Sequence, residues 1–477
     1  MITLGDAQAA SGGRWLRCPF PLDTQLRAGA FDTRALGGAD IFFALAGERG
    51  GGHRYLAALA GTGVRLAVVS QDLDIAAFGG AILRVDDTRA ALGKMARLLV
   101  DRHRPLIVAI TGSYGKTTTK EIVAHVLAGG RRLLKTPGSF NNEIGVPLTL
   151  LDLDGSQDVA VLEFAARHPG DIRMLGAIAP PDVAVLLNVG RAHIGVFGTR
   201  ESIYLAKAEI FEHLRPGGLA VVGAEDPRLR ELAAGQRTVT IGAGGDYRAE
   251  EIAFDREGRE RFTAIHGTTR LALRAGVPGP HGHVPLLAAW AVVREAGLPD
   301  ALVAERGAHH AGAKGRAVLI SAPGGATVID DTYNASPETV VNLIRTLAAL
   351  DAEAKVLVIG HLSELEEGLG ESLAAIAPHL APPLSELWVH DPARPESAAQ
   401  YRAVARGIAV REIPVLPELI AALRERDRPG VAIGIKGSRS AHMERAVQGL
   451  LGMDVACRLP SCGLLMHCTD CEALTRR

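Results

Sequence analysis

The stretch LIVAITGSYGKTTTKEIVAHVL, residues 106–127, decides the fold of the middle of this chain. Its apolar start leads into a short loop with Gly112 and Gly115, and Lys116 and Thr117 then open an amphipathic segment. This order predicts a strand, a loop and a helix, whose free amide groups can surround a phosphate. Because the Lys116 ammonium can reach terminal phosphates and the Thr117 hydroxyl can bind magnesium, the stretch predicts a nucleoside triphosphate site.

One residue departs from the usual Walker spacing, because Ile110 stands where the first glycine of that motif falls. The alternative interpretation is a chance Gly-x-x-Gly-Lys-Thr in an ordinary strand-to-helix turn. Since the local patterns agree on strand, loop and helix, we interpret the segment as a phosphate-binding loop.

Length and composition indicate a multidomain α/β protein with small-molecule partners. The chain has 477 residues, 47% of them hydrophobic and 4% aromatic, which suits about three domains of alternating strands and helices. No apolar run approaches the roughly 18 residues of a membrane span, and the N-terminus lacks the pattern of a secretory signal. The formal charge of -1 gives no general attraction to nucleic acid or anionic lipid. We therefore expect a cytoplasmic monomer that neither binds nucleic acid nor inserts into membranes.

Apolar runs divide the chain into three units and a tail. Residues 1–103 form a small α/β unit, and residues 104–304 combine the phosphate loop with β-branched runs typical of parallel strands buried on both faces. Within that second unit, residues 247–275 favour antiparallel strands. Residues 305–452 form a third alternating unit, and residues 453–477 lose helical periodicity, so we expect a disordered tail.

The tail contains four of the five cysteines, too few in total for a disulfide framework of the body. Cys457, Cys462, Cys468 and Cys471, with His467, form the pattern C-x4-C-x4-H-C-x2-C. This has one CxxC pair rather than the two pairs of a zinc ribbon. A dispensable tail is the favoured interpretation, and zinc binding is the alternative.

Three polar residues lie close to predicted strands or helices of the second unit. Glu163 is the next-to-last residue of the run DVAVLEF, at the sheet edge that collects ligands. The pattern alone favours a magnesium ligand and a solvated strand end equally. His193 follows another apolar strand, where a lone histidine is more often structural. Lys207 lies on a helix, where the default is a solvated lysine.

Eight sequence blocks, taken in order, resemble the Mur ligase family over nearly everything up to about residue 452. They are FDTR with IFFALAGERGGGH, TGSYGKTTTKE, TPGSFNNEIGVPLTL, LEFAARHPGDI, NVGRAHIGVFG, LAKAEIF, VIDDTYNASP and IKGSRSAHME. The resemblance implies a small N-terminal α/β domain that holds a UDP-sugar, a central P-loop-type ATPase domain with a mostly parallel sheet, and a C-terminal Rossmann-like domain.

The resemblance also implies an activity. The expected enzyme is an ATP-dependent, ADP-forming ligase that joins D-alanyl-D-alanine to UDP-N-acetylmuramoyl-tripeptide through an acyl phosphate, in peptidoglycan precursor synthesis. One alternative is a similar ligase that joins a different carboxylate and amine. A nucleotide-binding protein without ligase activity is the other.

Residue roles follow from the positions that match the family. Lys116, Glu163, His193 and Lys207 are the expected catalytic residues, and two magnesium ions are expected on Thr117, Glu163, His193 and Lys207, the last of them carbamylated. The expected ATP contacts are Gly112, Ser113, Gly115, Lys116, Thr117, Thr118, Arg316, Asp331 and Asn334, with Tyr333 beside them. The expected substrate contacts are Asp32, Thr33, Arg34, Asn141, Asn142, Lys436, Ser438 and Arg439.

Several positions depart from the family pattern. Gly282 and Pro285 stand where the family usually has asparagines, and neither has a side-chain amide for adenine or ribose. His361 stands where the family has aspartate. The phosphate and magnesium positions are intact, so the sequence predicts conserved chemistry with substrates that can differ.

Overall fold

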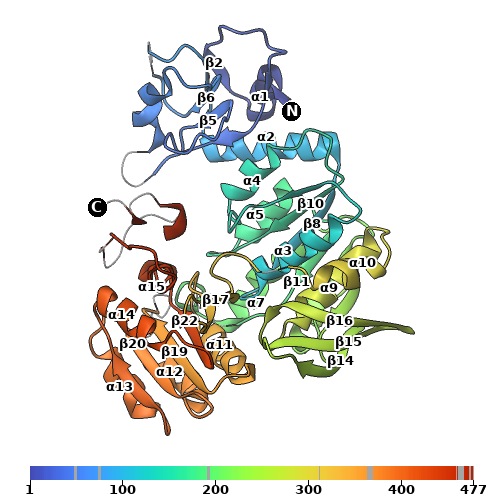
Figure 1. Ribbon diagram of the computed structural model, residues 1–477. Coiled ribbons are helices and arrows are strands. Elements are labelled where there is room, and N and C mark those ends of the chain that lie inside the picture. The colour runs from blue at the N-terminus through green and yellow to red at the C-terminus, as the bar shows by residue number, and fades with distance from the viewer. Residues whose placement is uncertain are drawn as a thin grey trace.

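The computed structural model describes residues 1–47, 51–73, 77–190, 194–310, 312–362, 369–457, 459, 467–471 and 474–475. Each of three successive α/β domains has its own main sheet, and the chain passes from the N-terminal domain through the central domain to the C-terminal domain (Figure 1). The predicted fold class is therefore confirmed. His193, an expected magnesium ligand, lies outside the described residues.

The N-terminal domain is built on a five-stranded sheet of order β2-β7-β6-β5-β4, in which only β2 is antiparallel to its neighbour. Helix α1 begins with a capping box between Thr3 and Asp6, and Asp87 caps α2, so local sequence fixes both helix starts. The main-sheet strands are β2 (Arg14–Arg17), β4 (Gly29–Ala30), β5 (Ile41–Phe43), β6 (Leu66–Val69) and β7 (Ala81–Arg84). The remaining elements are β1 (Ile2–Thr3), which pairs with β3 (Gln25–Leu26), α1 (Leu4–Ser11), η1 (Gly52–Leu59) and α2 (Thr88–His103).

The central domain contains a nine-stranded sheet of order β16-β15-β14-β13-β12-β11-β8-β10-β9. The strands are β8 (Leu106–Thr111), β9 (Leu133–Lys135), β10 (Val159–Glu163), β11 (Val183–Leu186), β12 (Leu219–Gly223), β13 (Arg237–Ile241), β14 (Tyr247–Phe254), β15 (Arg259–His266) and β16 (Thr269–Pro278). Strands β8 to β13 are mutually parallel, and β14 pairs parallel with β13. The β14–β15 and β15–β16 pairs are antiparallel, as the polar pattern of residues 247–275 predicts.

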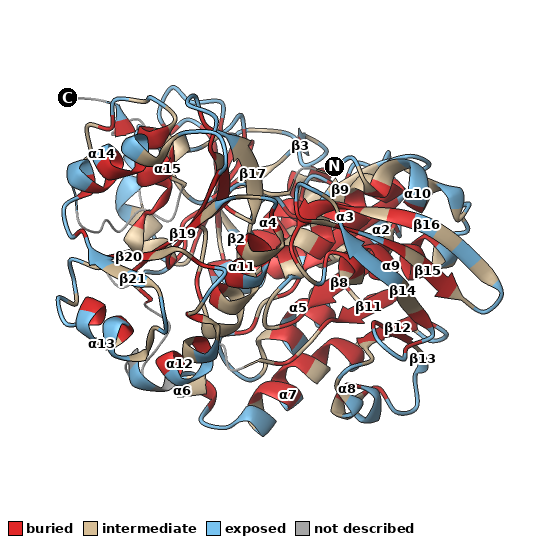
Figure 2. Ribbon diagram, turned by 60° about the horizontal axis from the view of Figure 1, so that its bottom comes forward, coloured by how far each residue is buried: buried red, intermediate tan, exposed pale blue. Residues whose placement is uncertain are grey.

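Helices cover both faces of the central sheet. Alternate residues of β8 belong to opposite cores: Val108 and Ile110 pack with α3 and α9, and Ile107 and Ala109 pack on the other face. Figure 2 shows the buried residues gathered along this sheet and on the helices against it. The helices are α3 (Lys116–Leu127), α4 (Gly145–Leu150), α5 (Asp171–Ile178), α6 (Ile194–Phe197), α7 (Arg200–Ala208), η2 (Glu209–Phe211), α8 (Pro227–Leu232), α9 (His283–Glu295) and α10 (Ala301–Gly307).

The C-terminal domain has a six-stranded sheet of order β17-β18-β22-β19-β20-β21, parallel except for β17. The strands are β17 (Val318–Ser321), β18 (Thr327–Asp331), β19 (Ala354–Gly360), β20 (Glu386–His390), β21 (Ala409–Glu412) and β22 (Val431–Lys436). The helices are α11 (Pro337–Ala349), α12 (Leu369–Ile376), η3 (Ala377–His379), α13 (Ser397–Val404), α14 (Leu416–Arg426), η4 (Arg439–Ala441), α15 (Glu444–Leu450) and η5 (Cys468–Asp470).

The tail, for which the sequence predicts disorder, has described residues that pack on the C-terminal domain. Cys468 and Leu474 are buried with that domain's apolar core, and the Ala456 amide donates a hydrogen bond to the Leu474 carbonyl. The Lys314 ammonium forms a 2.6 Å ion pair with Asp470. Among the described residues, no helix combines the length and the apolar character needed to cross a membrane.

Candidate active site

The phosphate loop connects β8 to α3 and is held in place by Asn188, which follows β11. Gly112 and Gly115 have φ values of +156° and +79°, backbone conformations that residues other than glycine rarely adopt. The Asn188 Oδ1 accepts from the amides of Ser113 (3.1 Å) and Tyr114 (3.2 Å), and its Nδ2 donates to the Tyr114 carbonyl (3.2 Å). Sequence reasoning missed Asn188, although its place directly after an apolar parallel strand is a usable signal.

Lys116 lies across the loop that it follows. Its Nζ donates to the Gly112 carbonyl (2.7 Å) and to the Ser113 carbonyl (3.2 Å). Thr117 is buried at the start of α3, and Thr118 lies beside it on the wall of a large cavity. The loop therefore already gathers an ammonium group and the helix N-terminus at the carboxyl end of β8.

Glu163 lies at the same sheet edge, because it ends β10 and pairs in register with Ile110 of β8. Its side chain is buried, and Oε1 accepts a 2.7 Å hydrogen bond from the Asn141 Nδ2. Oε2 is also buried and has no hydrogen-bond partner among the described residues. A buried carboxylate oxygen without a donor is costly unless a cation satisfies it, so the arrangement fits a magnesium ligand.

Lys207 of α7 contacts the loop and is only 4% exposed. Its Nζ donates to the Gly112 carbonyl at 3.3 Å. Burial, reinforced by the nearby Lys116 charge, lowers the pKa of Lys207 from 10.5 to about 7. The solvated-lysine default is thus wrong for this residue, and about half of its amine is neutral near pH 7.

The C-terminal domain contributes the facing wall. The Lys436 Nζ, buried at the end of β22, forms a 2.5 Å ion pair with Asp331 and donates to the Asn334 carbonyl at 2.9 Å. The guanidinium of Arg316 stacks 4.1 Å from the ring centre of Tyr333. Tyr333 also hydrogen-bonds Ser139, so this wall contacts the central domain directly. Lys436, an expected substrate contact, thus binds directly to Asp331 and Asn334, which are expected nucleotide contacts.

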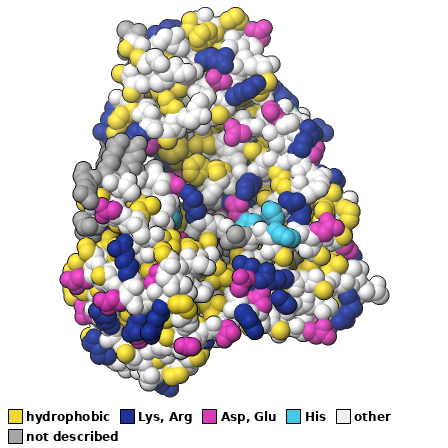
Figure 3. All heavy atoms as spheres, viewed as in Figure 1, with side chains coloured by type: hydrophobic (Ala, Val, Ile, Leu, Met, Phe, Trp, Pro, Cys, Tyr) yellow, Lys and Arg dark blue, Asp and Glu magenta, His cyan; other side chains and the backbone are white. Residues whose placement is uncertain are grey.

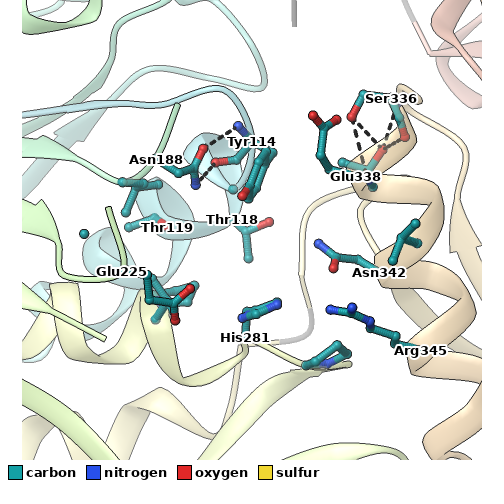
Figure 4. Close-up of a pocket in the computed structure, with 18 of the residues that line it drawn as sticks. Tyr114, Thr118, Thr119, Asn188, Glu225, His281, Ser336, Glu338, Asn342 and Arg345 are labelled. Atoms are coloured by element: carbon teal, nitrogen blue, oxygen red, sulfur yellow. Dashed lines mark hydrogen bonds between the residues drawn. The ribbon is translucent and has the colours of Figure 1, made fainter. Parts of the chain in front are cut away.

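A cavity of about 730 Å³ separates the two walls. Thr118, Glu225 and His281 line it from the central domain, and Figure 4 shows Asn342 and Arg345 of α11 opposite them. Gly115, Arg316 and Asp331 also line the cavity, so it joins expected ATP contacts from both domains. Its size and its border on the phosphate loop suit the nucleoside part of a nucleotide.

The departures from the family pattern lie at the margins of this arrangement. Gly282 and Pro285 line the cavity, where the buried Glu260 accepts from the amides of His281 (3.1 Å) and His283 (2.8 Å). His361 directly follows β19, which pairs with β22. Its Nδ1 lies 3.1 Å from the Asp391 carboxylate, and its backbone carbonyl accepts from the Ser438 amide. A carboxylate is thus present beside His361, supplied by the neighbouring strand.

The remaining expected substrate residues are more dispersed. Asp32 and Arg34 form a local ion pair of 2.6 Å in a surface loop between β4 and β5, outside the cavity, and Thr33 lies between them. The Asn142 Oδ1 accepts from the Gly145 amide (3.0 Å) at the start of α4. Ser438 is buried after β22, and Arg439 forms a 2.6 Å ion pair with Glu444. Figure 3 shows positive and negative side chains interspersed over one face of the molecule.

Two family descriptions match the chain. The Mur ligase middle domain matches residues 110–293, and the Mur ligase, glutamate ligase domain matches residues 315–439. These ranges contain the phosphate loop and the facing wall respectively.

Named relatives align over most of the chain. UDP-N-acetylmuramoyl-tripeptide--D-alanyl-D-alanine ligase of Mycobacterium tuberculosis (strain CDC 1551 / Oshkosh) is 31% identical over 479 residues, covering 89% of this chain and 92% of that protein. The ligase of the same name from Escherichia coli (strain K12) is 31% identical over 441 residues, covering 90% and 94%.

Solved structures agree with these alignments. MurF from Acinetobacter baumannii superimposes with a TM-score of 0.85 at 31% identity, covering 94% of this chain and 98% of that one. The MurF ligase of Thermotoga maritima, solved in complex with ADP, gives a TM-score of 0.78 at 29% identity, with coverage of 89% and 97%.

Proposed function

The chain belongs to the Mur ligase family, and from this premise we propose that it joins D-alanyl-D-alanine to UDP-N-acetylmuramoyl-tripeptide, forming ADP and phosphate. Both named relatives have this activity in their names and align over about nine-tenths of the chain. One structural observation carries the proposal furthest: Glu163, Lys116 and Lys207 converge on one end of the phosphate loop. The enzyme is an ATP-dependent carbon–nitrogen ligase of peptidoglycan precursor synthesis.

The reaction needs ATP because a carboxylate is a poor acyl donor. Transfer of the γ-phosphoryl group to the tripeptide carboxylate gives an acyl phosphate and ADP. The free amine of the dipeptide then attacks the acyl carbon, loses a proton and displaces phosphate. Water must be excluded, since it would hydrolyse the acyl phosphate, and contact between the central and C-terminal walls supplies that exclusion.

The loop residues position the triphosphate. Asn188 holds the loop in shape by accepting from the Ser113 and Tyr114 amides, and the Lys116 ammonium neutralises charge on the transferring phosphoryl oxygens. Across the cavity, Arg316 and Asp331 would contact the nucleotide. Asn334 would join them, since the Lys436 ammonium that pairs with Asp331 also donates to the Asn334 carbonyl. Thr118 is the proposed ATP contact on the side of the cavity formed by the phosphate loop.

Magnesium is the cofactor that these residues would hold. We propose that two magnesium ions bind here and that their ligands come from Thr117, Glu163, His193 and Lys207. Lys207 would be carbamylated. Bound magnesium would screen the phosphate charges during transfer. A lysine takes up carbon dioxide only as the neutral amine, and the lowered pKa of Lys207 supplies that form near neutral pH.

The other substrates are assigned to the flanking domains. Asp32, Thr33 and Arg34 bind the uridine nucleotide, with Asn141 and Asn142 near the peptide end. Lys436, Ser438 and Arg439 lie on the side of the incoming dipeptide. We also propose that the enzyme is a cytoplasmic monomer. Size-exclusion chromatography with light scattering tests its monomeric state.

A second candidate keeps the reaction and changes the substrates. It is favoured by Gly282 and Pro285, which line the cavity without a side-chain amide, and by His361, which stands where the family has aspartate. The expected chemistry is the same in both cases, so only substrate identity distinguishes them.

Phosphate release from ATP provides the test. The assay combines UDP-N-acetylmuramoyl-tripeptide with D-alanyl-D-alanine and compares this pair with a panel of other carboxylates and amines, product mass being confirmed by mass spectrometry. Turnover with the first pair supports the proposal. Turnover restricted to another pair supports the second candidate, and no turnover with any pair would contradict both.

A further inference from the structure

A compact group of three buried side chains lies outside the proposed active site, where the tail meets the C-terminal domain. The Nδ1 of His442 lies 3.3 Å from the Sγ of Cys468 and 3.8 Å from the Oε1 of Glu444. All three residues are buried, and their possible ligand atoms lie within 4.8 Å of one another. Imidazole, carboxylate and thiol together form a donor set that zinc prefers.

We propose that His442, Glu444 and Cys468 bind a zinc ion. Bond lengths of about 2.0–2.3 Å around tetrahedral zinc place pairs of ligand atoms about 3.4–3.6 Å apart. The Cys468 Sγ to His442 Nδ1 separation of 3.3 Å differs from those values by only a few tenths of an ångström, and the Glu444 carboxylate is near enough for all three ligand atoms to lie within 4.8 Å of one another. Zinc binding therefore needs only small side-chain movements, and water is sufficient as the fourth ligand.

The hydrogen bonds around Glu444 leave one oxygen for the ion. Oε1 accepts from Arg439 (2.6 Å) and from the backbone amide of Cys468 (3.0 Å). Oε2 is buried and has no hydrogen-bond partner among the described residues. An orphaned buried carboxylate oxygen costs free energy, which coordination of a cation would recover.

A divalent cation here would meet two ligands that can carry negative charge, the Glu444 carboxylate and the Cys468 thiolate. Arg439 already pairs with Glu444, so one more positive group would be unfavourable unless it brought its own compensation. Zinc binds the Cys468 thiolate, whose proton is released on binding. The thiolate and the Glu444 carboxylate together neutralise the ion.

The geometry assigns a different ligand set from the one that the tail pattern suggests. In that pattern Cys468 and Cys471 form a CxxC pair, yet Cys471 is not part of the buried cluster. His442 and Glu444 come instead from the segment that follows β22. The ion would thus fasten the tail to the segment that carries Arg439, beside the ion pair of Lys314 with Asp470.

Zinc binding can be measured on the full-length protein without reference to ligase activity. The chain is stripped with a chelating resin and titrated with zinc against a chromophoric chelator, and cobalt substitution reports thiolate ligation by its charge-transfer absorption. We expect about one tightly bound zinc per chain, and Cys468→Ser and His442→Ala should weaken binding about 100-fold. Cys471→Ser is the matched control and should bind like the wild type.

Each outcome decides the proposal. Stoichiometric zinc that is lost in Cys468→Ser and His442→Ala but kept in Cys471→Ser supports it. Equal loss in Cys471→Ser would place the ion on the CxxC pair, and absence of zinc or of a cobalt–thiolate band would leave only a thiol–imidazole hydrogen bond; either result overturns the assignment. Unfolding followed by tryptophan fluorescence establishes that the variants are folded, and faster proteolysis of the tail after chelation is a second expected readout.

Discussion

Replacing Lys207 by methionine should stabilise the central domain at low pH while it abolishes ligase activity. The lysine is buried, and its pKa falls from 10.5 in the unfolded chain to about 7 in the folded protein. Methionine keeps an unbranched side chain of similar size and never carries a charge. The substitution therefore separates the energetic cost of the buried amine from its chemical role.

The sign and magnitude follow from proton linkage. Because the folded pKa is the lower one, the unfolded chain binds more protons between pH 7 and pH 10.5, and wild-type stability rises with pH in that interval. The full pKa difference corresponds to a penalty of about 5 kcal/mol near pH 6, which falls to about 2 kcal/mol at pH 9. Loss of the 3.3 Å hydrogen bond to Gly112 offsets about 1 kcal/mol of the gain.

The assay is urea unfolding at pH 6 and pH 9, in bicarbonate-free buffer so that Lys207 remains an amine. Trp15 and Trp388 lie in the other domains, so their replacement by phenylalanine leaves Trp290 as the reporter of the central domain. The free energy of unfolding of Lys207→Met should exceed that of its parent protein by about 4 kcal/mol at pH 6 and about 1 kcal/mol at pH 9. The exposed Lys94→Met is the control, because it makes the same substitution at a lysine that lies in water. A stability difference that is the same at both pH values would refute the reasoning.

Three further substitutions test the remaining parts of the site. Lys116→Ala should lower kcat about 1,000-fold in the phosphate-release assay, because charge on the transferring phosphoryl group loses its counterion; substantial residual turnover would show that the loop is misassigned. Glu163→Gln should raise the magnesium concentration for half-maximal activity about 10- to 100-fold with little change in folding, and an unchanged magnesium titration would contradict its role as a ligand. Lys436→Met should destabilise the C-terminal domain by about 3 kcal/mol, followed by Trp388 fluorescence, because Asp331 loses its buried partner; an unchanged midpoint would show that the ion pair contributes little.

The sequence predicts the elements whose signals are local. The order of apolar run, glycine loop and amphipathic segment around Lys116 predicts β8 and α3, since every part of the pattern lies within about two dozen residues. The polar alternation of residues 247–275 predicts the antiparallel β14, β15 and β16. Strand β21 was not predicted, because its residues lie at a sheet edge and are mostly exposed, which removes the apolar pattern.

Features that depend on distant residues could not be predicted in the same way. Asn188 orients the phosphate loop from 74 and 75 residues away, and only the sheet order brings β11 beside β8. Asp391 reaches His361 because β19 and β20 are neighbours. The buried thiol of Cys468 meets His442 across 26 residues, whereas the local CxxC spacing suggests a different partner.

The short phosphate loop has an electrostatic consequence that supports the magnesium assignment. β8 continues through Ile110, which is fully buried, so the loop starts late and Glu163 lies level with its beginning. Lys116 and Lys207 both donate to the Gly112 carbonyl, at 2.7 and 3.3 Å, so the Lys116 ammonium and the Lys207 amine both face this end of the loop. A triphosphate would be attracted by Lys116 and repelled by the buried Glu163 carboxylate. The buried Oε2 of Glu163, without a hydrogen-bond partner among the described residues, would be suited to hold a divalent cation, whose charge would offset that repulsion.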